Sequence, residues 1–209
     1  MSILIPSIPP QEIEARSMAI IASELTVPLD PQQAPIIMRV IHASADFSYA
    51  ETLSFSEDAL RSAYTALQTG AQIITDTNMA LSGISTPALR YLNGEKRCFM
   101  ADPDVACAAR ARGETRAVLA VEKALSLPEP KIFVFGNAPT GLIRLCQAIE
   151  AGTCHPALVV GAPVGFVHVL EAKDYLQSLP VPQIVAQGRK GGSNIAAAII
   201  NALLYQLAR

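Results

Sequence analysis

Short apolar segments alternate with longer stretches of helical periodicity along most of this chain. Each apolar segment is bounded by Gly, Pro or Asp, and the segments cover residues 72–75, 97–101, 131–135, 156–160 and 182–186. Strands that alternate with helices are joined by right-handed crossovers, which build a parallel sheet with helices on both faces. The alternation therefore predicts an α/β fold, a three-layer α/β/α sandwich whose mainly parallel sheet has about five strands in flavodoxin-like order.

Helices are predicted in the N-terminal part of the chain, before the first strand. An apolar stripe at helical spacing predicts a helix over residues 10–25. Asp30 and Pro31 have the residue types of an N-cap and a first helical position, so a second helix is predicted from there to His42. Residues 47–55 have no clear periodicity and are expected to form a short helix or an irregular segment.

The chain has the length of one generous α/β domain. No repeat, low-complexity tract or linker divides its 209 residues, so a single domain over residues 1–209 is expected. Charged residues make up only 16% of the sequence, whereas about 25% is usual in soluble domains. A surface so poor in charge is expected to be partly buried between subunits, most simply in a homo-oligomer.

Charge and hydropathy exclude several kinds of partner. The formal net charge is −2 and no run of Lys or Arg occurs, so nucleic acid and anionic membranes are poor candidates. Residues 1–10 lack the basic start of a signal peptide, and the apolar run 157–170 is too short to span a bilayer. The four cysteines have no C-x-x-C or ligand-like histidine spacing, so buried thiols are expected rather than a metal site. We therefore expect a soluble, cytoplasmic protein.

A polar pair lies within the apolar segment that ends at His42. Arg39 stands inside the run 36–41, and the carboxylate of Asp46 follows shortly after it. A histidine can act as an acid or a base near neutral pH, and an arginine can hold a substrate carboxylate in a fork of hydrogen bonds. A single histidine at a helix end is also commonly structural. The segment makes His42 a candidate acid–base residue and leaves both interpretations open.

Glycine-rich loops follow the last three predicted strands, at residues 136–141, 161–166 and 187–193. In a parallel sheet these loops meet at the carboxyl ends of the strands, where open α/β sheets bind ligands. Glycines allow close approach of the backbone, helix N-termini attract anions, and Arg189 and Lys190 add positive charge. The pattern predicts a pocket for an anion with several carboxylates or phosphates. The alternative is that Gly and Pro only form strand-to-helix turns.

Motifs of the common nucleotide and hydrolase sites are missing. The loop after residue 135 lacks the G-K-[ST] end of a P-loop, and no strand is followed by G-x-G-x-x-G. The sequence contains no G-x-S-x-G or H-E-x-x-H, and His155 and His168 stand alone and are expected to be structural. These absences disfavour a flavodoxin-like phosphotransferase or nucleotide-binding enzyme. Composition and spacing alone lead to an α/β protein with an anion pocket.

Several short motifs stand in a characteristic order along nearly the whole chain. They are Arg16-Ser17, Arg39-Val40-Ile41-His42, Asp46, Thr75-Asp76 with Met79, Gly83-Ile84, Gly136-Asn137-Ala138-Pro139-Thr140, Pro163-Val164-Gly165-Phe166-Val167 and residues 188–193. Together they resemble the family of precorrin-8X methylmutase and its cobalt-precorrin-8 counterpart in cobalamin biosynthesis. One departure is Ala172, between Glu171 and Lys173, where the family usually has serine.

The resemblance implies a flavodoxin-like homodimer that acts as an isomerase. The implied reaction moves a methyl group from C-11 to C-12 of (cobalt-)precorrin-8 and gives (cob)hydrogenobyrinate, formally a 1,5-sigmatropic shift. The resemblance implies no organic cofactor, because the macrocycle is its own electron system, and any cobalt is carried within the substrate. No metal site of the protein itself is expected. A non-catalytic tetrapyrrole carrier with the same pocket is the alternative.

The resemblance also implies roles for individual residues. His42 matches the catalytic position and is expected to protonate, or to hydrogen-bond to, a ring nitrogen of the macrocycle. Ser17 and Arg39 match positions that bind substrate, and Asp46 is a hypothetical orienting group for His42. The other expected substrate-binding residues are Asp46 itself, Thr75, Asp76, Arg116, Asn137, Thr140, Arg189, Lys190 and Ser193. Thr75, Asp76 and the 136–140 loop could instead serve only the strand-to-helix turns.

Overall fold

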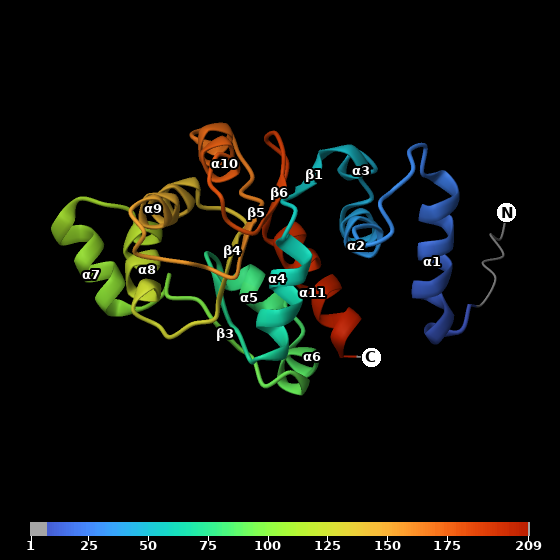
Figure 1. Cartoon of the computed structure of the whole chain (residues 1–209), viewed down its shortest axis with the longest axis horizontal. Helices are drawn as coiled ribbons and strands as arrows, with labels where there is room; N and C mark the ends of the chain where they lie inside the picture. Colours follow the sequence, from blue (N-terminus) through green and yellow to red (C-terminus); the bar gives the residue numbers. More distant parts are fainter. Residues whose placement is uncertain (1–7, 209) are drawn as a thin grey trace, which may run out of the picture.

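A computed structural model describes residues 8–208 of the chain (Figure 1). Residues 1–7, most of the segment considered for a signal peptide, and residue 209 lie outside the described part. Within it, six strands form one sheet in the order β1-β6-β5-β4-β2-β3. The strands are β1 (Leu53–Phe55), β2 (Gln72–Thr75), β3 (Glu95–Arg97), β4 (Lys131–Phe135), β5 (Leu158–Gly161) and β6 (Gln183–Ala186).

Five of these strands form the parallel sheet that the sequence predicts. Their order, β3-β2-β4-β5-β6, is the flavodoxin order, with the second of the five strands outside the first. The predicted segments 72–75 and 131–135 coincide with β2 and β4. The expected fold class is confirmed, and the sheet has one strand more than the predicted five.

The additional strand, β1, pairs antiparallel with β6 at an edge of the sheet, where Leu53 lies opposite Ala186. The sequence favours a short helix or irregular structure over residues 47–55, and this segment forms α3 (Tyr49–Thr52) followed by β1. A strand of three residues has no readable periodicity of its own. Its extended form depends on pairing with β6, which is distant in the sequence, so local patterns miss it.

The second of the five parallel strands is displaced from its predicted place. The apolar residues 97–101 predict the strand, whereas β3 covers Glu95–Arg97. β3 is an edge strand, and charged side chains on an edge strand disfavour pairing with other chains. The apolar Phe99 follows the strand and is 8% exposed, packed in the core on one face of the sheet.

Helices cover both faces of the sheet and complete the three layers. One core receives Ile132 and Val134 of β4, and the other receives Phe133 and Phe135, because successive side chains of a strand point to opposite faces. The helices on the first face are α2 (Ala34–Ser44), α4 (Ala59–Gln68), α5 (Asn78–Gly83), α6 (Thr86–Tyr91) and α11 (Ser193–Leu207); those on the second are α7 (Pro103–Arg112), α8 (Arg116–Leu125), α9 (Pro139–Glu150) and α10 (Val169–Gln177).

The first helix, α1 (Pro10–Glu24), lies beyond α2 at one end of the molecule (Figure 1). It buries Ile21 in the core on the α2 side. Ile13 and Ile20, seven residues apart, are 52% and 49% exposed and leave an apolar strip on the surface of α1. The helix is where the sequence predicts it, and its outer face has no cover within residues 8–208.

The second helix begins later than the sequence predicts. The Oδ1 atom of Asp30 accepts hydrogen bonds from the backbone N–H groups of Gln32 and Gln33, at 2.8 and 3.2 Å, and so stabilises a turn. The helix α2 begins only at Ala34, with Pro35 in its first turn, where a missing N–H does no harm. Asp30 caps the turn that precedes the helix rather than the helix itself.

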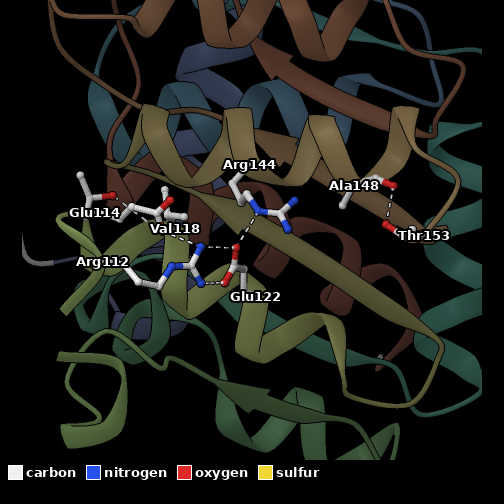
Figure 2. Close-up of polar contacts among 8 residues, drawn as sticks. Arg112, Glu114, Val118, Glu122, Arg144, Ala148 and Thr153 are labelled. Atoms are coloured by element: carbon white, nitrogen blue, oxygen red, sulfur yellow. Dashed lines mark hydrogen bonds and ion pairs between the residues drawn. The ribbon is translucent and has the colours of Figure 1, made fainter. Parts of the chain in front are cut away.

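An ion-pair network joins three helices of the second layer (Figure 2). Arg112 at the end of α7 binds Glu122 of α8, with Nη1 at 2.5 Å from Oε2, and Arg144 of α9 donates from Nε to the same carboxylate at 3.0 Å. Arg112 holds the pKa of Glu122 below its usual range. Arg112 also pairs with Glu114 at 2.8 Å, so these charges are committed to one another and not to a ligand.

The cysteines are free thiols with different surroundings. Cys146 and Cys154 are buried, as the sequence predicts, whereas Cys107 is exposed on α7 and corrects that expectation. Among residues 8–208, no group of three or more His, Cys, Asp and Glu could hold a metal ion. No helix of that part of the chain has the length and apolar character needed to cross a membrane.

Candidate active site

The carboxyl ends of the parallel strands define one edge of the sheet. There β2, β4, β5 and β6 end at Thr75, Phe135, Gly161 and Ala186. Because β1 runs antiparallel to β6, its first residue, Leu53, lies at this same edge. The chain before β1 therefore also reaches this edge. It brings the end of α2, which carries His42, close to the strand-to-helix loops.

His42 lies in the last turn of α2, and its side chain is exposed. Within residues 8–208, its imidazole makes no hydrogen bond or ion pair. The helix ends two residues later at Ser44, and Ala45 adopts a left-handed φ of 53° that turns the chain away from the helix axis. The histidine is therefore available to a ligand at the edge of the sheet.

Asp46 binds a lysine that is distant in the sequence and not His42. The Nζ of Lys190 donates to Asp46 Oδ2 at 2.7 Å and to Ser48 Oγ at 3.0 Å, and the N–H of Ser48 donates to Asp46 Oδ1 at 3.0 Å. Lys190, with help from Ser48, holds the pKa of Asp46 below its ordinary value of 3.8. The hypothesis that Asp46 orients His42 is not supported by this geometry. Asp46 instead ties the end of α2 to the loop between β6 and α11.

Replacing Lys190 by methionine is expected to raise the pKa of Asp46 toward 3.8, because the lysine is the main stabiliser of the ionised carboxylate. In the native protein the pair contributes stability above the ordinary pKa of the carboxyl group, and this contribution is lost as the pH falls through the lowered value. An NMR titration of the Asp46 carboxyl carbon measures the shift. Arg189→Met is the control that should leave it unchanged, and an unchanged pKa in Lys190→Met would assign the effect to Ser48.

Arg39 of α2 and Ser17 of α1 belong to two helices that pack against each other. The Nη2 of Arg39 is 2.5 Å from Glu14 Oε1, and its guanidinium lies 5.2 Å from the centre of the Tyr205 ring. Arg39, Glu14 and Tyr205 border a surface cavity of about 340 Å³ between α1, α2 and α11. Ser17 donates from Oγ to the carbonyl of Ile13 at 2.9 Å. A substrate carboxylate at Arg39 would have to compete with Glu14.

Asp76 shapes the loop after β4. Its carboxylate is 6% exposed and accepts three backbone hydrogen bonds, from Gly136 at 2.9 Å, Asn137 at 2.7 Å and Ala138 at 2.6 Å. Burial raises the pKa of Asp76, and the three N–H donors act in the opposite direction. Thr75 is also buried and donates from Oγ1 to the carbonyl of Thr77 at 3.0 Å. The side chains of Thr75 and Asp76 therefore stabilise the strand-to-helix turns. This is the alternative to substrate binding that the sequence allows for them.

Close backbone contacts join the loops to one another. A Cβ on Gly136 would lie 2.6 Å from the Cα of Ser193, so only glycine lets the loop after β4 meet the start of α11. The Oγ of Ser193 is 2.7 Å from Thr77 Oγ1. Ser193, which is predicted to contact the substrate, therefore makes a hydrogen bond within the protein. Gly191 has a φ of +157°, and its Cβ would lie 2.2 Å from the carbonyl oxygen of Ala162. The loop after β6 therefore rests directly on the loop after β5.

Arg189 contributes an exposed cation on the same loop. Its Nη1 donates to the carbonyl of Phe166 at 2.9 Å, and its guanidinium lies 5.5 Å from the centre of the Phe166 ring. Phe166 and Val167 are themselves 82% and 72% exposed, and Met79 after β2 is 71% exposed. Apolar side chains thus accompany the basic ones on the loops at this edge. The exposure of these three residues is not visible in the sequence pattern.

Three other predicted residues lie toward the N-termini of α8 and α9. Asn137 is exposed in the loop before α9, and Thr140 in its first turn has Oγ1 3.0 Å from Thr115 Oγ1. Arg116 is exposed at the first position of α8. The Thr115–Thr140 contact joins these two N-termini. The structure therefore gathers Asn137, Thr140 and Arg116 in one area, with the side chains of Asn137 and Arg116 open to solvent.

Sequence reasoning misses two residues that organise the site. Ser48 completes the Lys190–Asp46 contact, and no local pattern reveals it. Lys173 is 1% exposed within the buried face of α10. Its spacing from Val169, Ala172 and Leu176 places a lysine inside an apolar stripe, which is a readable sign of a buried charge.

Comparisons with known proteins agree on one family. A family model described as precorrin-8X methylmutase matches residues 12–206. A cobalt-precorrin-8 methylmutase of Salmonella typhimurium is 47% identical over 207 residues, which cover 95% of this chain and 96% of that protein. A protein of the same description from Priestia megaterium is 38% identical over 198 residues, which cover 94% and 88%. The solved structure of a precorrin-8x methyl mutase from Thermus thermophilus matches with a TM-score of 0.87 and 42% identity, over 95% of this chain and 96% of that one.

Proposed function

Because this chain belongs to the precorrin-8X methylmutase family of isomerases in cobalamin biosynthesis, we propose that it moves a methyl group from C-11 to C-12 of a precorrin-8 macrocycle. His42 is the proposed proton donor and acceptor for the macrocycle. The cobalt-containing substrate is the first choice, because both curated relatives described above carry that name. The product is the isomer with the conjugation of the corrin ring.

The observation that carries this proposal is the exposed imidazole of His42 at the ligand edge of the sheet, which has no partner among residues 8–208. A proton given to the macrocycle, or a hydrogen bond to it, draws electrons from the conjugated system and weakens the bond between C-11 and its methyl group. The methyl then forms its bond to C-12, and the proton returns to His42. No atom is gained or lost, as an isomerisation requires.

The loops offer the charges and apolar contacts that such a substrate needs. The rim of the macrocycle carries acetate and propionate groups, and Arg189, Lys190 and Arg116 are cations exposed on or beside the strand-to-helix loops. The N-termini of α9 and α11 add their positive dipole ends to the same edge. Phe166 and Val167 supply exposed apolar surface for the macrocycle.

No organic cofactor is part of the proposed reaction. The conjugated macrocycle accepts and returns the electron density itself, and the protein contributes a proton and a fixed position. Where cobalt is present, it enters and leaves within the substrate. The cytoplasm is the proposed compartment, because Cys98, Cys107, Cys146 and Cys154 are all free thiols and a reducing environment keeps thiols free.

We also propose that the protein is a homodimer that covers the exposed strip of α1. Replacing Ile13 and Ile20 by glutamate together is expected to convert the dimer into a monomer, because two charges would then be buried in the subunit contact. Sedimentation equilibrium measures the mass. Tyr91→Glu, at a side chain that is 70% exposed elsewhere, is the control that should leave a dimer. A native protein that sediments as a monomer would contradict the proposal.

An absorbance assay with purified protein tests the proposed reaction. Precorrin-8x and cobalt-precorrin-8 are added separately, and a spectral change to the corrin product with one of them is the expected result. Binding of either compound without any spectral change would overturn the isomerase proposal in favour of a tetrapyrrole carrier. Binding of neither compound would mean that the family scaffold serves another ligand in this protein.

A further inference from the structure

A lysine lies buried beneath the basic loop of the site. Lys173 belongs to the inner face of α10, and its side chain is almost completely removed from solvent. Its Nζ donates to the backbone carbonyl of Gly188 at 2.7 Å and to that of Lys190 at 2.8 Å. Both acceptors belong to the loop between β6 and α11. The contact therefore joins α10 to the backbone on either side of Arg189.

The charge of this lysine has no carboxylate partner within residues 8–208. In the described part of the chain its ammonium group donates only to carbonyl groups, and burial lowers its pKa to about 8. A buried ammonium without a counter-ion costs free energy, because its hydration is lost and not fully replaced. A methionine of similar volume would avoid that cost. The two hydrogen bonds to the loop are what the protein gains from the lysine.

The loop above Lys173 is fixed at three consecutive carbonyl groups. Those of Gly188 and Lys190 accept from Lys173, and the carbonyl between them, of Arg189, accepts from the N–H of Gly165 at 3.2 Å. The side chains that leave this stretch are those of Arg189 and Lys190. With its backbone held in this way, Lys190 reaches Asp46, next to the end of α2.

We propose that Lys173 is a positioning residue for substrate binding, which holds Arg189 and Lys190 toward the carboxylates of the substrate through the carbonyls of Gly188 and Lys190. It touches no reacting atom, so it acts only through the loop. The identity of the substrate in this inference rests on the proposed function, whereas the fixing of the loop does not. Loss of Lys173 should therefore weaken binding more than it slows the chemical step.

The first test is Lys173→Met, which shortens the side chain by one atom and removes its donors. We expect KM for the precorrin-8 substrate to rise about tenfold, as for the loss of one charge-assisted contact, while kcat changes by less than about threefold. Lys131→Met is the matched control, since Lys131, the first residue of β4, is 3% exposed and donates to the carbonyls of Leu125 and Leu127. It should lower stability and leave KM unchanged.

A second variant shows whether Lys173 acts through Lys190. Lys190→Met should raise KM in the native background and change it little further in Lys173→Met, because the misplaced loop no longer presents the cation. If the increase in KM of the double variant equals the product of the two single increases, Lys173 does not act through Lys190. Equal KM values in Lys173→Met and the native protein would overturn the inference as a whole and leave Lys173 with a structural role only.

Two further measurements keep the inference testable if a variant folds poorly or the reaction differs. Lys173→Gln retains a donor for one carbonyl and should give an intermediate KM; a KM equal to that of the native protein would again overturn the inference. Amide hydrogen exchange needs no substrate and should be at least about tenfold faster at Gly165 and Gly192 in Lys173→Met, but not in Lys131→Met, because the N–H of Gly165 donates to Arg189 in this loop and that of Gly192 donates from this loop to Ala162. Equal exchange would overturn the positioning role, whereas a native protein without turnover would overturn the proposed function alone.

Discussion

Replacing His42 by alanine is expected to lower kcat for methyl migration by about 100- to 10,000-fold, the usual contribution of general acid–base catalysis. The imidazole is exposed and unpartnered within residues 8–208, so its removal leaves no buried group unsatisfied and should not disturb the fold. Substrate affinity should stay within about threefold, because the loops and not His42 supply the binding charges. The absorbance assay at saturating substrate gives kcat, and a titration of the variant with substrate gives the affinity.

A second histidine provides the control for this experiment. His155 is also exposed, but it precedes β5 and so lies at the opposite edge of the sheet, and His155→Ala should retain full activity. A native rate in His42→Ala would remove His42 from the chemical step. A loss of affinity with kcat unchanged would make His42 a substrate contact. Either result would leave the proton donor to be found among the other groups at this edge.

The sheet was largely predictable because its central strands are short, apolar and buried on both faces. β2 and β4 coincide with their predicted segments, and the alternation of strands with helices predicts that the strands pair in parallel. The two edge strands were not predictable in the same way. β1 and β3 have three residues each, and their extended form depends on a neighbour that local periodicity does not include.

The site was predictable in its position and less so in its contacts. Strand order and the loop glycines place the basic loop at the ligand edge of the sheet. The partners of Asp46 and Arg39 are Lys190 and Glu14, which are 144 and 25 positions away in the sequence. Such pairings arise from tertiary packing, and they cannot be predicted from the types of the residues. The Arg39–Glu14 pair joins α2 to α1, and the Lys190–Asp46 pair joins the loop after β6 to the segment after α2. Sequence reasoning assigns Arg39, Lys190 and Asp46 to the substrate.

Asp76 shows most clearly how the partners of a residue in the structure change the role that its sequence position suggests. As a carboxylate at the end of a strand it resembles a ligand contact, yet its oxygens accept the N–H groups of Gly136, Asn137 and Ala138. Asp76 therefore determines where the start of α9 lies relative to the sheet.

Replacing Asp76 by alanine is expected to lower the free energy of unfolding by about 4 kcal/mol, because each buried donor left without a partner costs about 1–3 kcal/mol and Asn137 can in part turn to water. This is a large share of the roughly 5–15 kcal/mol that holds a typical domain together. Urea denaturation measures the change. Asp104→Ala, which removes a solvent-exposed partner of Lys123, is the control and should leave the unfolding midpoint nearly unchanged. Equal midpoints for the two variants would show that water replaces the carboxylate without loss, and the role of Asp76 in shaping the loop would then have to be abandoned.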